Sequence, residues 1–278
     1  MVVNKVMTGA EAVITALVEN GVEVIFGYPG GAVLPLYDAI FDNKKIKHVL
    51  VRHEQAAVHA AEGYARSTGK VGCVLVTSGP GATNAITGLT DALMDSIPVI
   101  CLSGQVPTHL IGTDAFQEAD TTGISRPCTK HNYLVKNADK LCDVIHESFE
   151  IASSGRPGPV LIDLPKDIQL TRIKYNKKSN KIKNKKSDNN FKIDMKIITK
   201  VVDLLINAEK PIIYAGGGVI NAGPKASNLL TELVDLLNSP VTLTLMGLGS
   251  VSNNNKNFLG MLGMHGTYEA NLAMHNCD

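Results

Sequence analysis

Long apolar runs are missing from this sequence. No stretch of about 18 apolar residues is free of charge or glycine, and a membrane-spanning helix needs roughly that length. The N-terminal MVVNKVMTGAEAV leads directly into an expected helix, without the apolar core of a signal peptide or the Arg/Ser-rich character of a transit segment. These absences predict a cytoplasmic protein with no membrane partner. A bacterial source is the simplest interpretation, although an organelle-encoded protein would look the same.

An excess of either charge is missing as well. The 278 residues include 27 Lys and Arg and 26 Asp and Glu. Nucleic-acid and membrane-surface binding usually require a clustered positive field, so neither is expected. The one basic cluster, KYNKKSNKIKNKKS at 174–187, has little apolar material and is typical of a solvated linker.

Cysteine and histidine patterns typical of metal sites are also lacking. The five cysteines are an odd number at wide spacing, with no CxxC pair, and no two histidines have metal-ligand spacing. We interpret the cysteines as reduced packing residues and expect no metal site within this chain.

What the sequence does contain is an alternation of helices with short, wholly apolar strands. Segments such as VGCVLV and PVICLS predict strands of a parallel sheet that is covered on both faces, which is an α/β fold. In the first part of the chain we expect helices near 8–20, 33–42, 54–67, 82–95 and 138–153, strands near 23–26, 48–51, 72–76, 98–103, 132–135 and 159–164, and irregular structure at 105–130. A second parallel unit is expected from a helix at 195–207, a strand at 211–215, a helix at 224–237 and a strand at 241–245.

These patterns predict two successive parallel-sheet α/β domains. The first covers residues 1–172, a polar linker covers 173–194, and the second covers 195–278. The second is expected to be truncated, because the sequence ends at MHNCD where another strand should begin.

Several polar or glycine-rich segments fall at the carboxyl ends of the predicted strands, where α/β sheets place their sites. A carboxylate, Glu54, enters the alanine-rich helix of VRHEQAAVHAAEGYAR, and VTSGPGATNAITGL follows it. Such a pair is a layout that holds a heterocyclic cofactor. Alone, Glu54 could simply favour the helix dipole, and the glycine loop could be an anion site or a tight turn.

Taken with FGYPGG (26–31), GTDAFQE (112–118), SGRPGPVLIDLPKDI (154–168) and LGMHGTYEAN (262–271), this pair resembles the catalytic subunits of the acetolactate synthase (acetohydroxyacid synthase) family, which are thiamine diphosphate (ThDP) enzymes. The resemblance implies a ThDP pyrimidine-binding domain followed by a partial FAD-binding-like central domain. The family's third domain binds the diphosphate and Mg²⁺ through a GDG motif, which is absent here.

The resemblance also implies roles for single residues. Glu54 would bond to N1′ of the aminopyrimidine and favour the imino tautomer that serves as the base, and Gln117 would lie close to ThDP as a second catalytic residue. The implied ThDP-binding residues are Tyr28, Pro29, Gly30, Gly31, Glu54, Thr77, Pro80, Asn84 and Gln117. The implied substrate-channel residues are Pro107, Ala115, Phe116, Lys130 and Lys166. Phe116 and Gln117 could instead be ordinary loop anchors, and Lys166 could pair with Asp163 or Asp167.

A structural FAD is implied for the second domain. GGGVINAG at 216–223 departs from GxGxxG, so an NAD fingerprint is not supported. The implied FAD-binding residues are Arg156, Gly216, Gly217, Gly218, Asn221, Thr244, Leu245, Met246, Leu262, Gly263, Met264, His265 and Gly266. A guanidinium such as that of Arg156 can hold pyrophosphate oxygens at two points.

The implied activity decarboxylates pyruvate and joins the product to a second 2-ketoacid, pyruvate or 2-ketobutyrate, in branched-chain amino-acid biosynthesis. A homo-oligomer and a small regulatory subunit are implied as partners. Two alternatives stay open: another ThDP enzyme such as a pyruvate oxidase, and a catalytically silent module that binds flavin or another subunit.

Overall fold

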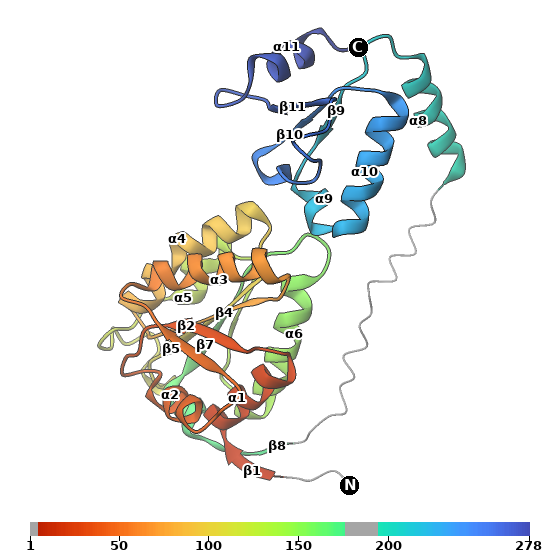
Figure 1. Ribbon diagram of the computed structural model, residues 1–278. Coiled ribbons are helices and arrows are strands. Elements are labelled where there is room, and N and C mark those ends of the chain that lie inside the picture. Colours follow the sequence, from red (N-terminus) through yellow and green to blue (C-terminus); the bar gives the residue numbers. More distant parts are fainter. Residues whose placement is uncertain (1–4, 176–193) are drawn as a thin grey trace. The chain divides into compact units, whose positions relative to one another are not determined.

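Parallel strands organise both parts of this protein. The computed structural model describes residues 5–175 and 194–278 (Figure 1). The chain divides into two compact units, residues 1–187 and 188–278. Among the described residues, no helix combines the length and the apolar character needed to cross a membrane.

The first unit is built on a six-stranded sheet with the order β3-β2-β4-β5-β7-β6, in which every neighbouring pair is parallel. The strands are β2 (Val24–Gly27), β3 (Lys47–Leu50), β4 (Gly72–Val76), β5 (Val99–Gln105), β6 (His131–Leu134) and β7 (Val160–Pro165). The central strands β4, β5 and β7 are buried along their whole length. This burial explains why their sequences are mostly apolar, because helices cover both faces.

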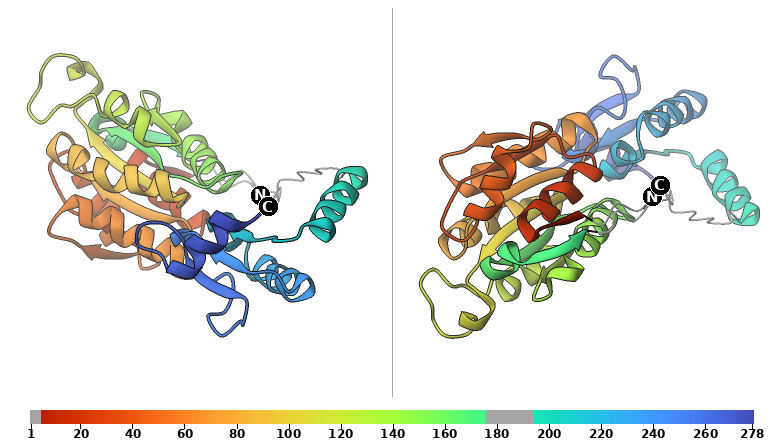
Figure 2. Two further views of the ribbon diagram at one scale, coloured as in Figure 1. Left: turned by 90° about the horizontal axis from the view of Figure 1, so that it is seen from above. Right: turned by 90° about the horizontal axis from the view of Figure 1, so that it is seen from below.

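Two helical layers cover this sheet (Figure 1, Figure 2). One layer contains α1 (Gly9–Glu19), α2 (Leu34–Phe41) and α6 (Leu141–Ser153), and its core includes Ile14, Leu17, Leu36 and Ile145. The other contains α3 (Glu54–Thr68) and α4 (Pro80–Asp95), whose small side chains, such as Ala57, Ala61 and Ala85, let the two helices pack closely on the sheet. The predicted capping box of Thr8 and Glu11 opens α1.

The predicted elements of the first unit are all present, and four further ones were missed. They are a short antiparallel ribbon of β1 (Lys5–Thr8) and β8 (Arg172–Tyr175), and the five-residue helices α5 (Thr121–Ser125) and α7 (Lys166–Leu170). The segment expected to be irregular, 105–130, therefore contains one helix, with single 3₁₀ turns at Thr108–Leu110 and Arg126–Cys128. β8 also places residues 173–175, expected in the linker, within the first unit. The rest of that linker, 176–193, lies outside the described residues.

The second unit has a three-stranded parallel sheet, ordered β11-β10-β9. Its strands are β9 (Ile213–Ala215), β10 (Val241–Leu243) and β11 (Phe258–Met261), and its helices are α8 (Met195–Asn207), α9 (Gly217–Asn221), α10 (Pro224–Leu237) and α11 (Tyr268–Asn276). A small core of Ala215, Val234, Val241, Leu243 and Val251 holds it together. The expected parallel α/β arrangement is confirmed for both units; α9, β11 and α11 were not predicted.

Candidate cofactor site

Glu54 is the first residue of α3 and is largely buried. The preceding residue, His53, caps this helix by accepting a hydrogen bond from the backbone N–H of Gln55 at 3.1 Å. Asn84 on α4 donates its side-chain amide to Glu54 Oε2 at 3.0 Å. No donor among the described residues bonds Oε1, so one carboxylate oxygen is fixed and the other is available.

The loops that follow β2 and β4 pack directly on each other. A Cβ added at Gly30 would lie 2.5 Å from Thr77 Cβ, and the backbone N–H of Ala32 donates to Thr77 Oγ1 at 3.4 Å. A Cβ added at Gly81 would lie 2.7 Å from Thr77 Cγ2 and 3.5 Å from Glu54 Oε1. Glycine at these positions therefore leaves the surface beside Glu54 open.

The segment 106–120 reaches the same edge of the sheet through its backbone. Gln117 has a positive φ of 57°, and a Cβ added at Gly79, whose φ is also 57°, would lie 2.6 Å from the Gln117 carbonyl oxygen. The Glu118 carboxylate accepts the backbone N–H groups of Gly112 and Ala115, and these bonds lower its pKa. Phe116, which directly precedes Gln117, is 86% exposed. The predicted ThDP residues on three separate loops are thus neighbours in the structure.

Lys130 and Arg156 lie near the amino ends of β6 and β7, whereas the loops described above follow the carboxyl ends of their strands. Lys130 Nζ donates to the carbonyls of Ile151 and Ser154 at the C-terminal end of α6. Arg156 donates through Nε to Ser96 Oγ at 2.7 Å and through Nη2 to the carbonyls of Leu93 and Met94, at the C-terminal end of α4. Since α4 has 16 residues, roughly 24 Å separates this end from the glycine loop at its start. Both cations cap helices here, and the channel and flavin roles expected for them stay predictions.

Lys166 is the first residue of α7 and makes no ion pair among the described residues. The alternative pairing with Asp163 or Asp167 is wrong. Asp163 is buried and bonded to Ser103 and Gln105, whereas Asp167 accepts hydrogen bonds from Thr108. Pro107 directly precedes the 3₁₀ turn of Thr108 and lies on the segment that carries Phe116.

The residues expected to bind flavin in the second unit follow its three neighbouring strands. Gly216–Gly218 come after β9, Thr244–Met246 after β10, and Leu262–Gly266 after β11. A Cβ at Gly217 would lie 3.0 Å from Met246 Cβ, and Thr244 Oγ1 accepts the Gly247 N–H at 3.0 Å. The residue Asn221 ends α9. The predicted FAD-binding residues of this unit therefore follow the carboxyl ends of its strands. Arg156 is the exception, because it belongs to the first unit.

Comparison with known families identifies both units. The N-terminal TPP binding domain of thiamine pyrophosphate enzymes matches residues 7–124, and the central domain of thiamine pyrophosphate enzymes matches residues 198–278. The chain belongs to the thiamine pyrophosphate enzyme family. The family resemblance expected from the sequence motifs is thereby confirmed.

Individual relatives narrow the resemblance within the thiamine pyrophosphate enzymes. The acetolactate synthase large subunit of Haemophilus influenzae is 54% identical over 99% of this chain and 48% of its own length. The isozyme 3 large subunit of Escherichia coli acetolactate synthase is also 54% identical, with the same coverage, and the mitochondrial catalytic subunit of Saccharomyces cerevisiae is 50% identical over 98% of this chain and 40% of its own length. The chain spans about half the length of the curated relatives it matches.

One buried carboxyl group near the site of this thiamine pyrophosphate enzyme was not predicted from the sequence. Asp163 on β7 accepts hydrogen bonds from Ser103 Oγ at 2.7 Å and Gln105 Nε2 at 2.9 Å, and Gln105 also donates to the Ala119 carbonyl at 2.9 Å. Burial raises the pKa of Asp163 to about 7, although both hydrogen bonds favour the charged form. This network ties the segment that carries Gln117 to the sheet. Because its members are up to 60 residues apart, only the strand register could have revealed it.

Proposed function

We propose that this chain supplies the N-terminal and central domains of an acetolactate synthase. In this proposal the enzyme decarboxylates pyruvate and joins the product to pyruvate or 2-ketobutyrate, in branched-chain amino-acid biosynthesis. The observation that carries the proposal is the Glu54 carboxylate, which is buried at the start of α3, held at one oxygen by Asn84 and available at the other.

The Glu54 carboxyl group and the open surface beside it fit the aminopyrimidine of ThDP. A heterocycle with a ring nitrogen and an amino group needs a carboxyl partner and a flat, open surface, and Glu54 beside Gly30 and Gly81 provides both. When bound, ThDP supplies a thiazolium ring that stabilises the carbanion left by decarboxylation. Glu54 Oε1 would bond to the ring nitrogen and exchange a proton there, while the Asn84 amide fixes the carboxylate's orientation.

The remaining ThDP residues would shape the pocket. We assign Tyr28–Gly31, Thr77 and Pro80 to its wall, and Gln117 to the face that the segment 106–120 closes. Closure by this segment would exclude water and strengthen every polar interaction with the cofactor. The exposed Phe116 is assigned to the substrate side, with Pro107 and Ala115 on the same segment.

Two further cofactors belong to the proposal. FAD would bind along the carboxyl edge of the second sheet, where glycines at 216–218 let a dinucleotide approach the backbone. Joining two ketoacids with loss of CO₂ has no net oxidation or reduction, so this flavin would be structural. Mg²⁺ and the diphosphate of ThDP would be held by residues outside this chain, since the relatives are about twice its length.

The partners follow from the relatives' names. A small regulatory subunit is proposed because the Haemophilus and Escherichia relatives are called large subunits. We also propose a homo-oligomer in the cytoplasm.

The experiment joins this chain to the C-terminal half of the Haemophilus influenzae relative and measures acetolactate formed from pyruvate with ThDP, Mg²⁺ and FAD. We expect acetolactate from the fusion. Reduction of the flavin by pyruvate without acetolactate would contradict the proposal and favour a pyruvate oxidase.

A matched pair of variants tests the role of Glu54 in the same fusion. Glu54→Gln keeps the size and the contact with Asn84 but removes the exchangeable proton, so we expect the rate to fall by roughly 10² or more. Glu150→Gln, at an exposed residue of α6, serves as the control for a glutamate substitution. Equal rates for Glu54→Gln and the parent would remove Glu54 from the mechanism.

A further inference from the structure

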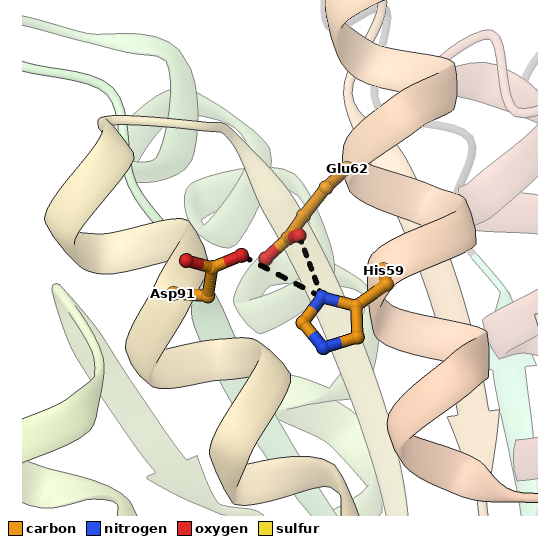
Figure 3. A group of neighbouring side chains, drawn as sticks. All are labelled: His59, Glu62 and Asp91. Atoms are coloured by element: carbon orange, nitrogen blue, oxygen red, sulfur yellow. Dashed lines mark hydrogen bonds and ion pairs between the residues drawn. The ribbon is translucent and has the colours of Figure 1, made fainter. Parts of the chain in front are cut away.

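A histidine and two carboxylates meet where α3 and α4 pack together (Figure 3). His59 and Glu62 are one turn apart on α3, and Asp91 projects from α4. His59 Nδ1 lies 3.0 Å from Glu62 Oε2 and 3.6 Å from Asp91 Oδ2. No metal site was expected from the sequence, because no two histidines have metal-ligand spacing; this group instead combines one histidine with acids from two helices.

Glu62 is the member of this group that needs an explanation. Glu62 is only 5% exposed, and its Oε1 atom is buried without a hydrogen-bond partner. In Figure 3 its carboxylate points into the space between His59 and Asp91. A buried carboxylate oxygen without a hydrogen-bond donor destabilises the folded state, and a second carboxylate beside it adds repulsion.

A proton on His59 compensates for only part of this arrangement. An imidazolium N–H at Nδ1 can donate to Glu62 Oε2 and lies near Asp91, but it leaves Glu62 Oε1 unpartnered. A cation bound between the three side chains would neutralise both carboxylates and occupy the free oxygen at the same time.

The separations fit a metal ion. Two ligand atoms that each lie about 2.1 Å from a tetrahedral or octahedral ion are roughly 3.0–3.4 Å apart. The observed 3.0 and 3.6 Å bracket this range, and one ligand atom from each residue can be chosen so that all lie within 4.8 Å of one another. Helix bundles bind transition metals with a Glu and a His three residues apart on one helix together with acids from neighbouring helices; the spacing is the same here, although His59 precedes Glu62.

We propose that His59, Glu62 and Asp91 form a binding site for a divalent transition-metal cation such as Zn²⁺ or Mn²⁺, with its remaining positions open to water. Imidazole together with carboxylates suits these ions better than Mg²⁺, which prefers oxygen ligands alone. Water can reach the ion beside His59 and Asp91, whose side chains are 40% and 49% exposed.

The second nitrogen of His59 already has a neighbour that can orient the ring. His59 Nε2 lies 3.4 Å from the side-chain amide of Gln55, one turn earlier on α3. Rotation of that amide presents its oxygen to an Nε2–H group, which leaves Nδ1 unprotonated for the metal.

The proposed ion would join the two helices that begin at the cofactor site. Glu54 starts α3 and Asn84 lies in the second turn of α4, so an ion between Glu62 and Asp91 fixes one helix against the other. The site lies roughly 12 Å along α3 from Glu54, given eight residues at the helical rise. The ion's role in this proposal is structural.

The test is calorimetric titration of chelator-treated chain with Zn²⁺ and, separately, Mn²⁺. We expect one ion per chain, and a loss of affinity of roughly tenfold or more in Asp91→Asn and in Glu62→Gln. Asp91→Asn is the decisive variant because Asp91 is half exposed and its substitution leaves the core intact. His275→Ala, which removes an exposed histidine on α11, is the matched control and should bind as the parent does.

A second measurement locates the ion independently of affinity. X-ray absorption at the zinc edge should show one imidazole nitrogen with oxygen ligands in the parent, and the nitrogen should be lost in His59→Ala. Far-ultraviolet circular dichroism checks that each variant is folded. The proposal is overturned if the folded parent binds neither ion below millimolar concentration, or if Asp91→Asn and His59→Ala bind as the parent does.

Discussion

Gly30 and Gly31 are adjacent, yet their surroundings differ completely. A Cβ at Gly30 would collide with the Thr77 side chain at 2.5 Å, whereas a Cβ at Gly31 would meet nothing within 4 Å. The loops after β2 and β4 can only stay in contact if the first of these residues lacks a side chain.

This difference gives the first prediction. Gly30→Ala should lower the free energy of unfolding by about 1–3 kcal/mol, because the added methyl group overpacks the contact with Thr77. Gly31→Ala should change it by less than about 0.5 kcal/mol. Urea titration of both variants followed by circular dichroism checks the pair, and equal stabilities would show that the two loops are not in contact.

The second residue-scale prediction concerns Asp163 and pH. Burial raises the pKa of Asp163 to about 7, far above that of an unfolded aspartate, so the folded state holds the proton more tightly. The stability that this proton contributes is complete below the unfolded pKa and is lost as the pH rises through 7. Between pH 5 and 8 the free energy of unfolding should fall by an amount on the order of 2 kcal/mol.

Asp163→Asn provides the matched control, because its amide imitates the protonated acid. Wild-type and variant chains should be compared by urea unfolding at pH 5 and pH 8. We expect the variant to lose less stability over this interval. Parallel pH profiles would contradict a raised pKa at this position.

Helix ends explain the positions of two basic side chains without any ligand. Lys130 caps α6 and Arg156 caps α4, each by donating to carbonyl groups that the last turn leaves unpaired. Burial lowers the pKa of Lys130, as expected for an ammonium group partly removed from water.

The third prediction follows at the scale of the element. Lys130→Met keeps the aliphatic stem but removes the donors, so it should destabilise the cofactor-free chain by about 1–2 kcal/mol. Lys166→Met should have almost no effect, since Lys166 makes no described hydrogen bond. Thermal unfolding monitored by circular dichroism compares them, and similar melting temperatures would argue against the cap.

The regular elements could largely be predicted from the sequence, and the physical reason is burial. Strands such as GCVLV are apolar throughout because both faces are covered, and α3 and α4 show long alanine-rich patterns. The five-residue helices α5, α7 and α9 are too short for such a pattern, and β1 and β8 depend on pairing across more than 160 residues. For the same reason Glu54 could be predicted from its motif, whereas the Asp163 network and the His59 group require the folded register.

At the scale of the whole molecule, α8 differs from every helix of the first unit longer than one turn. None of its residues is buried, and its exposed apolar side chains include Ile197, Val201, Leu204 and Ile206. An exposed apolar face on a helix favours association in water.

The fourth prediction is therefore that the isolated 278-residue chain self-associates in a concentration-dependent way. The double variant Leu204→Glu with Ile206→Glu should shift sedimentation velocity profiles toward the monomer. Phe41→Glu, which changes a single exposed side chain in the first unit, should not. Identical profiles for the parent and the double variant would show that α8 plays no part in association.

The ribbon of β1 and β8 has a consequence for the history of this domain. Its register places Lys5 opposite Tyr175, so the polypeptide enters and leaves the first unit side by side. A domain whose two ends pair with each other tolerates domain insertion and circular permutation without a change to its core. The β1–β8 ribbon therefore allows gene fusion to combine this unit with different neighbouring domains.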